Sequence, residues 1–348
     1  MCAESKRRGS YVRAVALSVF LNVGLACGDP TVAPSAEPED DAEEKALPGT
    51  WTSLAQMPNA RNHLTAAALN DVVYVAGGNA GPLNLAPPTA VLAYLPASDT
   101  WRTVGHLTRG VRSPGMAATN NRIHVIGGFR DNPFEATSLV QIFDPQLGTV
   151  TIGPPMPTRR GAPAVAVLDG RIHVIGGMMD DEYDVMGVLV TAHEAFDPMS
   201  RTWSAHAPLP VVSQLHGAVA LDGKIYVAAG MSDGRIHVYD AALNAWSVAA
   251  PASSDRPWFN RAIAAHGGKI YFFGGAQLPA TCCLGPSPRQ TARRFDPHTA
   301  MWEQLAPMPT ARFGHAVAVV GDVFYVIGGS PTGPYTSFSA ANERFTPR

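Results

Sequence analysis

The sequence contains little charge and almost no lysine. Charged residues make up 16% of the 348 residues, the formal net charge is −2, and only four of the 26 basic residues are lysine (Lys6, Lys45, Lys224 and Lys269). Soluble domains usually contain about 25% charged residues. A nucleic-acid-binding domain would carry a strongly basic surface, which this balance does not provide. We therefore expect no nucleic-acid partner.

Familiar catalytic and cofactor motifs are also missing. The sequence contains no HExxH, no Cys-x-x-Cys, no phosphate-binding loop, no GxSxG and no dinucleotide fingerprint. The carboxylates at Asp180, Asp181, Glu182 and Asp184 do not have EF-hand spacing, and we interpret them as a solvated acidic loop, with a Ca²⁺ site as the alternative. We expect neither a metal nor a cofactor.

No apolar run is long enough for a conventional membrane span. Ala14 to Ala26 is a charge-free stretch that follows a basic segment and precedes Cys27. As a helix it would measure about 20 Å, short of the ~30 Å hydrocarbon core. Residues 1–27 therefore predict a signal peptide of the bacterial lipoprotein type, with Cys27 as the lipidated residue. Cleavage to a soluble secreted protein and a retained anchor are the alternatives.

The stretch that follows the signal is acidic and rich in proline. Residues 28–49 contain no aromatic side chain and too little apolar surface to form a core, so we expect a disordered tether. The predicted location is extracytoplasmic: the bacterial cell envelope, in the periplasm or on the outer membrane, or secretion. The only expected link to a membrane is a lipid on Cys27.

Glycine and proline are abundant, and glycine recurs at a fixed period. The chain has 33 Gly and 30 Pro, about 18% of its residues, which disfavours long helices. An apolar segment ends in paired small residues six times, at Gly77-Gly78, Gly127-Gly128, Gly176-Gly177, Ala229-Gly230, Gly274-Gly275 and Gly328-Gly329, with spacings of 50, 49, 53, 45 and 54 residues. We expect the glycines to permit a turn and a close backbone approach.

Each period contains the signals of four short strands. A second apolar run precedes the glycine pair across a turn, often Asp-Gly, which predicts a hairpin. An aromatic residue follows downstream, and a Trp stands seven positions after it, as in Tyr94 with Trp101 and Phe196 with Trp203. Four strands in about fifty residues are typical of a propeller blade, and this pattern resembles the Kelch repeat.

The resemblance covers residues 50–348 and implies an all-β, six-bladed propeller. The sixth unit has a third strand, which contains Phe345, but no fourth strand after it. A segment with the features of a fourth strand, including Trp51, instead stands at the start of the folded region. We therefore predict that the N-terminal strand completes the last blade and closes the ring, which removes exposed sheet edges. A monomer is expected. The aromatic residues and tryptophans should pack between blades.

In a propeller, the loop that enters the first strand and the loop that follows the second strand emerge on one face, so ligand contacts are expected there. The candidate ligand-binding residues are Arg61, Arg112, Arg160, Trp258, Arg261 and Arg312. For the arginines, a structural role between blades and a ring that binds an anion such as a carboxylate or phosphate are both open. Trp258 beside Arg261 would suit a sugar ring.

Three functions are compatible with these residues. The first is a non-catalytic module that recognises a protein or a glycan. The second is a carbohydrate-active enzyme, because six-bladed bacterial Kelch proteins include an N-acetylneuraminate epimerase; the candidate acid and base are His216 and His315. The third is a structural role in the envelope. Catalysis is the less supported expectation, since the fold hosts binding modules and enzymes alike.

The mature region has one pair of cysteines, Cys282 and Cys283. Adjacent Cα atoms lie about 3.8 Å apart, which is below the usual range for a disulfide of about 4.4 to 6.8 Å, so a bond between them would be strained. Strained disulfides are the labile or functional kind. We expect a vicinal disulfide that stiffens a loop at the mouth of the propeller.

Overall fold

A computed structural model describes residues 46–81, 85–130, 135–179, 188–213, 217–228, 230, 234–250, 258–259, 262–277, 287–333 and 337–348. The chain divides into two compact units, Met1–Ala46 and Leu47–Arg348, and every strand named below belongs to the second. The predicted signal peptide, most of the tether, Cys27, His216, Arg261, Cys282 and Cys283 lie outside the described residues. Among those described, no helix is long and apolar enough to cross a membrane.

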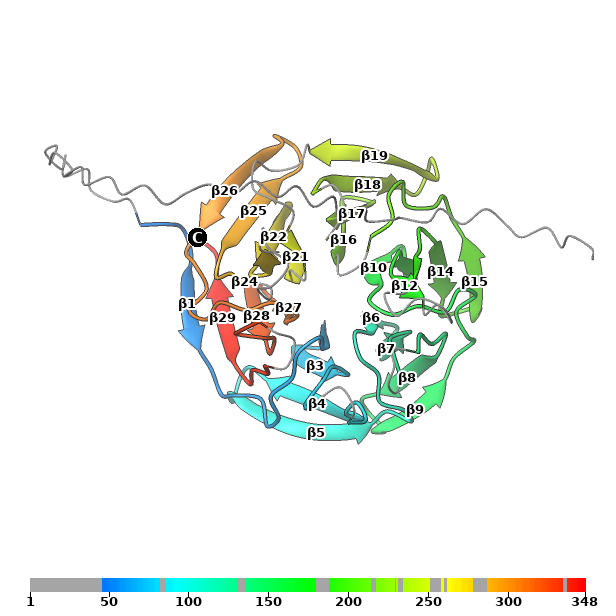
Figure 1. Ribbon diagram of the computed structural model, residues 1–348, viewed down its shortest axis with the longest axis horizontal. Coiled ribbons are helices and arrows are strands. Elements are labelled where there is room, and N and C mark those ends of the chain that lie inside the picture. The colour runs from blue at the N-terminus through cyan, green and yellow to red at the C-terminus, as the bar shows by residue number, and fades with distance from the viewer. Residues whose placement is uncertain are drawn as a thin grey trace, which may run out of the picture. The chain divides into compact units, whose positions relative to one another are not determined.

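Six antiparallel four-stranded sheets stand around a central axis as the blades of a propeller (Figure 1). Blade 1 is β2 (Thr65–Leu69), β3 (Val72–Ala76), β4 (Ala90–Leu95) and β5 (Thr100–His106). Blade 2 is β6 (Gly115–Thr119), β7 (Arg122–Ile126), β8 (Val140–Asp144) and β9 (Thr149–Ile152). Blade 3 is β10 (Ala164–Leu168), β11 (Arg171–Ile175), β14 (His193–Asp197) and β15 (Thr202–Ala205). The predicted all-β propeller is confirmed.

The other three blades repeat this order of strands. Blade 4 is β16 (Gly217–Leu221), β17 (Lys224–Ala228), β18 (Ile236–Asp240) and β19 (Ala245–Ala250). Blade 5 is β21 (Ala262–His266), β22 (Lys269–Phe273), β25 (Ala292–Asp296) and β26 (Met301–Leu305). Blade 6 is β27 (Ala316–Val320), β28 (Val323–Ile327), β29 (Asn342–Thr346) and β1 (Thr50–Ser53). Short strands β12 (Met178–Met179), β13 (Val188–Leu189), β20 (Trp258–Phe259), β23 (Ala276–Gln277) and β24 (Ser287–Pro288) extend the loops.

The ring closes because a strand from the N-terminal end of the propeller completes the last blade. β1 pairs antiparallel with β29, so that Trp51 lies opposite Phe345 in the register. In Figure 1 the blue strand β1 lies beside the red strand β29 at the rim. The Trp51 indole also donates a hydrogen bond to the carbonyl oxygen of Ala306, in blade 5, at 2.8 Å. The predicted closure is confirmed, and with it blade 6, like the other five blades, has four strands.

The tryptophans of the fourth strands contact the blade before their own. Each packs against the aromatic residue of its own third strand, as Trp101 does against Tyr94 with ring centroids 5.0 Å apart. Like Trp51, three other indoles donate a hydrogen bond to a carbonyl oxygen of the preceding blade: Trp101 to Ala55 at 2.8 Å, Trp203 to Pro154 at 3.1 Å and Trp246 to Ala207 at 2.7 Å. The predicted packing between blades is therefore confirmed, with a hydrogen bond added to it.

The glycine pairs join adjacent blades through the backbone. The amide of the second glycine donates to a carbonyl oxygen at the entrance of the next blade. The bonds run from Gly78 to Val111 (3.0 Å), Gly128 to Arg160 (3.0 Å), Gly177 to Ser213 (3.1 Å), Gly275 to Arg312 (2.9 Å) and Gly329 to Arg61 (2.8 Å). We call these five bonds the glycine junctions.

Only glycine fits at a glycine junction, for two separate reasons. Gly128 has a φ of +98°, where an L side chain is strained. A Cβ at Gly128 would also lie 2.8 Å from the carbonyl oxygen of Arg112, and one at Gly127 would lie 2.5 Å from that of Arg160. The expected close backbone approach is confirmed, and it explains why the pair recurs.

Two alanine variants, Gly128→Ala and Gly170→Ala, distinguish the backbone strain at a positive φ from the clash of a Cβ with a neighbouring carbonyl. Gly170 lies in the β10–β11 turn with a φ of +75°, and no atom lies within 4 Å of the position that a Cβ would take there. We expect Gly170→Ala to lower the free energy of unfolding by about 1–2 kcal/mol, the cost of the left-handed conformation alone. Gly128→Ala should cost clearly more because the neighbouring carbonyl must move. Urea unfolding measures both, and equal losses would contradict the steric reason for glycine at position 128.

Candidate functional site

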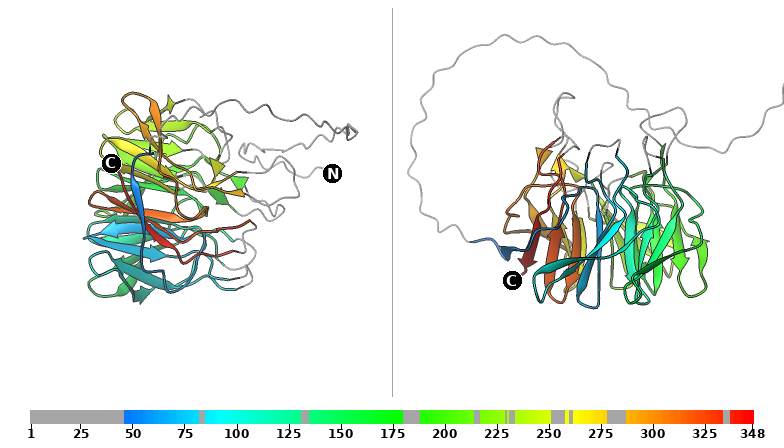
Figure 2. Two further views of the ribbon diagram at one scale, coloured as in Figure 1. Left: turned by 90° about the vertical axis from the view of Figure 1, so that its left-hand side faces the viewer. Right: turned by 90° about the horizontal axis from the view of Figure 1, so that it is seen from below.

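Two sets of loops meet on one side of each blade, as the sequence predicted. Residues that enter the first strand pair with residues that follow the second strand: Asn62 with Asn79, Arg112 with Phe129, Gly161 with Met178, Phe259 with Ala276 and Phe313 with Ser330. We call the surface formed by these loops the loop face, and the opposite surface, formed by the turns within the hairpins, the turn face. Figure 2 shows the blades side by side, with their strands running between the two faces.

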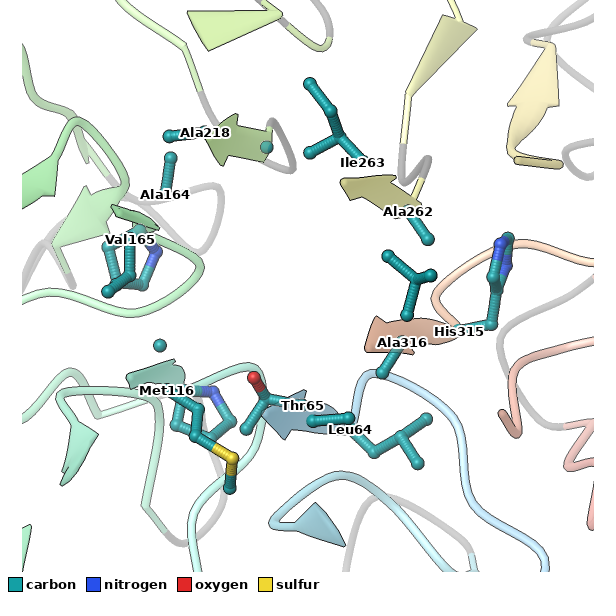
Figure 3. Close-up of a pocket in the computed structure, with 16 residues that line it drawn as sticks. Leu64, Thr65, Met116, Ala164, Val165, Ala218, Ala262, Ile263, His315 and Ala316 are labelled. Atoms are coloured by element: carbon teal, nitrogen blue, oxygen red, sulfur yellow. The ribbon is translucent and has the colours of Figure 1, made fainter. Parts of the chain in front are cut away.

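A narrow channel lies at the centre of the ring, lined by the first strands of the blades. Its volume is about 160 Å³, and small side chains surround it, including Ala164, Ala218, Ala262 and Ala316 (Figure 3). Thr65 and His315 are the polar side chains among its described lining residues, which include no carboxylate. The described lining of the channel therefore offers no carboxylate, lysine or arginine side chain to an acidic sugar.

Three of the candidate arginines are buried and bonded inside their own blades. Arg61, Arg160 and Arg312 are each at most 1% exposed. The guanidinium of Arg61 donates to the carbonyl oxygens of Gly77 and Ala90, at 3.3 and 3.2 Å. These side-chain contacts lie within blade 1. The backbone of Arg61 joins blade 1 to blade 6, since its amide donates to Ser339 at 3.0 Å and its carbonyl oxygen accepts from Gly329 at 2.8 Å.

Arg160 and Arg312 each form a buried ion pair with a glutamate on the third strand. Arg160 lies 2.9 Å from Glu194, and Arg312 lies 2.7 Å from Glu343. Burial lowers the pKa of Arg312 to about 10, and Glu343 opposes that shift, so the guanidinium is charged at neutral pH. Since their charges are already neutralised inside the fold, these arginines are not presented to a ligand on the loop face.

The glutamates were not singled out by the sequence analysis, although the repeat contains a signal for them. Glu194 and Glu343 also accept hydrogen bonds from Thr158 and Thr310, at 2.6 and 2.7 Å. In blade 2, Gln141 stands at the same register position and accepts from Thr108 at 2.8 Å. A Thr two residues before the Arg, as in TRR and TAR, would have pointed to a buried acceptor.

Arg112 differs from the other arginines because it joins two loops of different blades. It is buried, and its guanidinium donates to the carbonyl oxygen of Arg130 at 2.8 Å and to that of Leu85. Arg130 belongs to the loop after β7 and Leu85 to the loop after β3. Arg112 therefore holds the loops of blades 1 and 2 together beneath the loop face, alongside a cavity of about 90 Å³ with walls that include Pro87 and Pro88.

His315 lies beside the channel but is poorly placed for acid–base catalysis. Its side chain is 6% exposed, and in Figure 3 it stands to the side of Ala316, away from the centre of the opening. Burial, together with the charge of Arg312, lowers the pKa of His315 to about 3, so the imidazole is neutral at physiological pH. A general acid or base works best with a pKa near the operating pH. The other candidate, His216, lies outside the described residues.

The remaining candidates are described only in part. The backbone of Trp258 lies in β20, where it pairs with Gln277 of β23, so the residue belongs to an extension of the loop face. Arg261, Cys282 and Cys283 lie beyond the residues that can be described, and the sugar platform and the vicinal disulfide stay predictions.

A polar network that the sequence analysis missed crosses the loop face between blades 6 and 1. The amide of Asn79 donates to Asn62 at 3.0 Å, and Asn62 donates to the carbonyl oxygen of Ser337 at 2.9 Å. The Ser337 hydroxyl contacts Ser330 at 2.5 Å. Asn79 directly follows a glycine pair at a position where Phe129 and Met178 stand in blades 2 and 3, so the deviation within the repeat was the available signal.

Comparison with known proteins agrees with this architecture. A family model described as the KLHDC2/KLHL20/DRC7 Kelch-repeats domain matches residues 116–329. The chain belongs to this Kelch-repeat family. It is also similar to Kelch-like protein 35 of Mus musculus, with 28% identity over 226 residues that cover 65% of this chain and 37% of the relative. Kelch-like protein 23 of Homo sapiens is 24% identical over 256 residues, which cover 70% and 41% of the two chains.

The chain thus spans less than half of the length of these two relatives. Among solved structures, the one titled "Structure of YjhT" matches 84% of this chain and 97% of its own with a TM-score of 0.70. At 18% identity that likeness shows the fold alone.

The buried ion pairs can be tested against an exposed one. Glu343→Ala leaves the charge of Arg312 buried without its partner, and we expect a loss of about 3–5 kcal/mol in the free energy of unfolding. Glu303→Ala is the matched control because Glu303 pairs with Arg294 at 2.6 Å while 44% of its side chain is exposed. Its loss should be about 1 kcal/mol or less. Denaturant titration measures both, and similar losses would refute a structural role for the buried pair.

Proposed function

We propose that this Kelch propeller is a non-catalytic binding protein of the bacterial cell envelope that recognises a protein partner with its loop face. The observation that carries the proposal is the arrangement of the loops around a nearly closed centre. Loops from several blades gather on one face, their bases fixed by the glycine junctions and by Arg112. Variable loops on a rigid scaffold are where binding concentrates.

The centre of the ring supports binding over catalysis. The described channel lining holds no carboxylate to work with His315, and its volume of about 160 Å³ is below the roughly 300–1,000 Å³ of usual small-molecule sites. A protein partner needs no deep cavity, because protein interfaces bury about 800 Å² on each side over a broad patch. The loop face offers such a patch.

Site-specific photo-crosslinking tests which face binds. A photoreactive phenylalanine derivative replaces Leu85 on the loop face in one variant and Leu243 on the turn face in the other; these residues are 55% and 74% exposed. We expect a protein adduct from position 85 in intact cells and none from position 243. Adducts from position 243 alone would refute the choice of face.

A glycan screen on the purified propeller separates the two ligand classes. If the ligand is a protein, no glycan should bind. Glycan binding that is abolished by Trp258→Ala, in the absence of any protein adduct, would replace the protein with a sugar ligand at the predicted platform. Phe259→Ala, at the adjacent position of the same short strand, serves as the matched control for loss of an aromatic residue.

The location in the envelope depends on Cys27. Lipid on this residue would hold the propeller at a membrane through the acidic, proline-rich segment 28–49. Cys27→Ser should abolish incorporation of labelled palmitate and move the protein from the membrane fraction to the soluble fraction. Cys2→Ser, in the segment predicted to be removed, should change neither. Label that persists in Cys27→Ser would contradict the lipid site.

A further inference from the structure

Three histidines of blade 3 meet at its boundary with blade 4. The rings of His173, His193 and His206 form a triangle, with centroids 5.1 Å, 5.2 Å and 5.1 Å apart. The His193 ring also packs edge-on against Tyr239 of β18, at 4.5 Å. The cluster therefore fills the contact between two adjacent blades, where the other blades of the ring place mostly apolar side chains.

The histidines are departures from the repeat of this same chain. At the register position of His193, the other blades have Val91, Val140, Ile236, Ala292 and Asn342. At the position of His173 four blades have tyrosine, and at that of His206 blades 5 and 6 have leucine. Of the six blades, only blade 3 has histidine at all three positions, and these three meet in space.

Hydrogen bonds fix the protons on the first pair of rings. The Nδ1 of His193 faces the carbonyl oxygen of Ala207 at 3.2 Å, and a carbonyl can only accept. His193 therefore carries its proton on Nδ1, and its Nε2 accepts from Nδ1–H of His173 at 2.9 Å. A second proton on His193 would face the Nδ1–H of His173, and the contact would then hold only if His173 moved its own proton to Nε2.

The third ring is fixed by the same reasoning. Asn244 Oδ1 accepts from the backbone amide of Ala207 at 2.9 Å, so it also accepts from the hydroxyl of Tyr239 at 2.8 Å. The Tyr239 oxygen is then the acceptor for Nδ1–H of His206 at 2.9 Å, and the hydroxyl of Ser204 donates to Nε2 at 3.0 Å. With each ring neutral, these contacts all join a donor to an acceptor; a second proton on His206 would turn the Ser204 hydroxyl to the carbonyl oxygen of Ala195, 3.5 Å away.

The surroundings oppose a positive charge on any of the rings. Burial lowers the pKa of His173 to about 4 and that of His193 to about 3, and it also lowers the pKa of His206. The charges that act on the rings from β11 and from the loop before β10 are those of Arg171 and Arg160, which add to this lowering. Their partners, Asp197 and Glu194, are already paired with these arginines. On the blade 4 side, Asp240 pairs with Lys224.

We propose that His173, His193 and His206 form an acid-sensitive joint between blades 3 and 4, closed while all three rings are neutral and opened when one is protonated. The sign follows from linkage. The histidines have a lower pKa in the closed joint than the ordinary value of about 6.5, so protons bind preferentially to the open form and acid favours opening. From a pKa of about 4 for His173, opening at pH 5 is favoured about 20-fold more than at pH 7.

Amide hydrogen exchange on the full chain, with a chelator present and rates corrected for the intrinsic effect of pH, tests the joint. We expect the opening equilibrium of β14 and β17 to rise about 20-fold between pH 7 and pH 5. The outer strands β25 and β26 of blade 5 are the internal reference and should change several-fold less. The same pH response in all these strands would overturn a local joint.

Variants built from the repeat itself decide whether the three rings are responsible. His173→Tyr, His193→Val and His206→Leu, combined, place residues of other blades in blade 3 and should abolish the extra exchange at pH 5. His206→Leu alone, which changes the least buried ring, should reduce the response and serves if the triple variant does not fold. His124→Tyr, at the position of His173 in blade 2, should leave the joint unchanged. An undiminished response in the histidine variants of blade 3 would overturn the proposal.

Discussion

Adjacent blades approach one another closely because a glycine amide of one blade reaches a carbonyl oxygen of the next. At 2.8–3.1 Å these glycine junctions are ordinary hydrogen bonds, each with a net contribution of about 1 kcal/mol. Their larger effect is geometric. A buried amide left without its partner costs more than the bond contributes, so each blade is held at the one separation that satisfies both groups. That separation sets the width of the channel and the positions at which the loops leave the ring.

The sequence was sufficient to predict whatever depends on periodicity. Paired small residues recur in all six units, and the aromatic residue with a tryptophan recurs in most of them, so the number of units followed from the spacing and the propeller from the resemblance to the Kelch repeat. These features repeat because the same contact is made at each boundary. A single copy such as Trp51, displaced to the start of the chain, could be recognised because four of the other five units have a tryptophan at the position that the last unit lacks.

The roles of individual side chains could not be predicted as well. Counting along the chain placed Arg160 and Arg312 correctly at the entrances of their blades, but spacing does not tell whether a side chain turns outward to a ligand or inward to a partner. The inward direction is set by Glu194 and Glu343, which lie more than thirty residues further along and become neighbours only through the sheet. Histidines 173, 193 and 206 show the same limit, because their meeting depends on three strands and the next blade.

The exchange of β1 into blade 6 has a consequence for how the molecule forms. Trp51 and Phe345 are paired although nearly the whole propeller lies between them along the chain. Contacts of such long sequence separation form late, because closing a large loop costs entropy before any contact repays it. Five blades can assemble from neighbouring segments as the chain emerges, but the sixth must wait for the last strand to be made. The newly made protein therefore remains an open arc with two unpaired edges until β29 has been made, and in that interval it is most exposed to aggregation and to proteases.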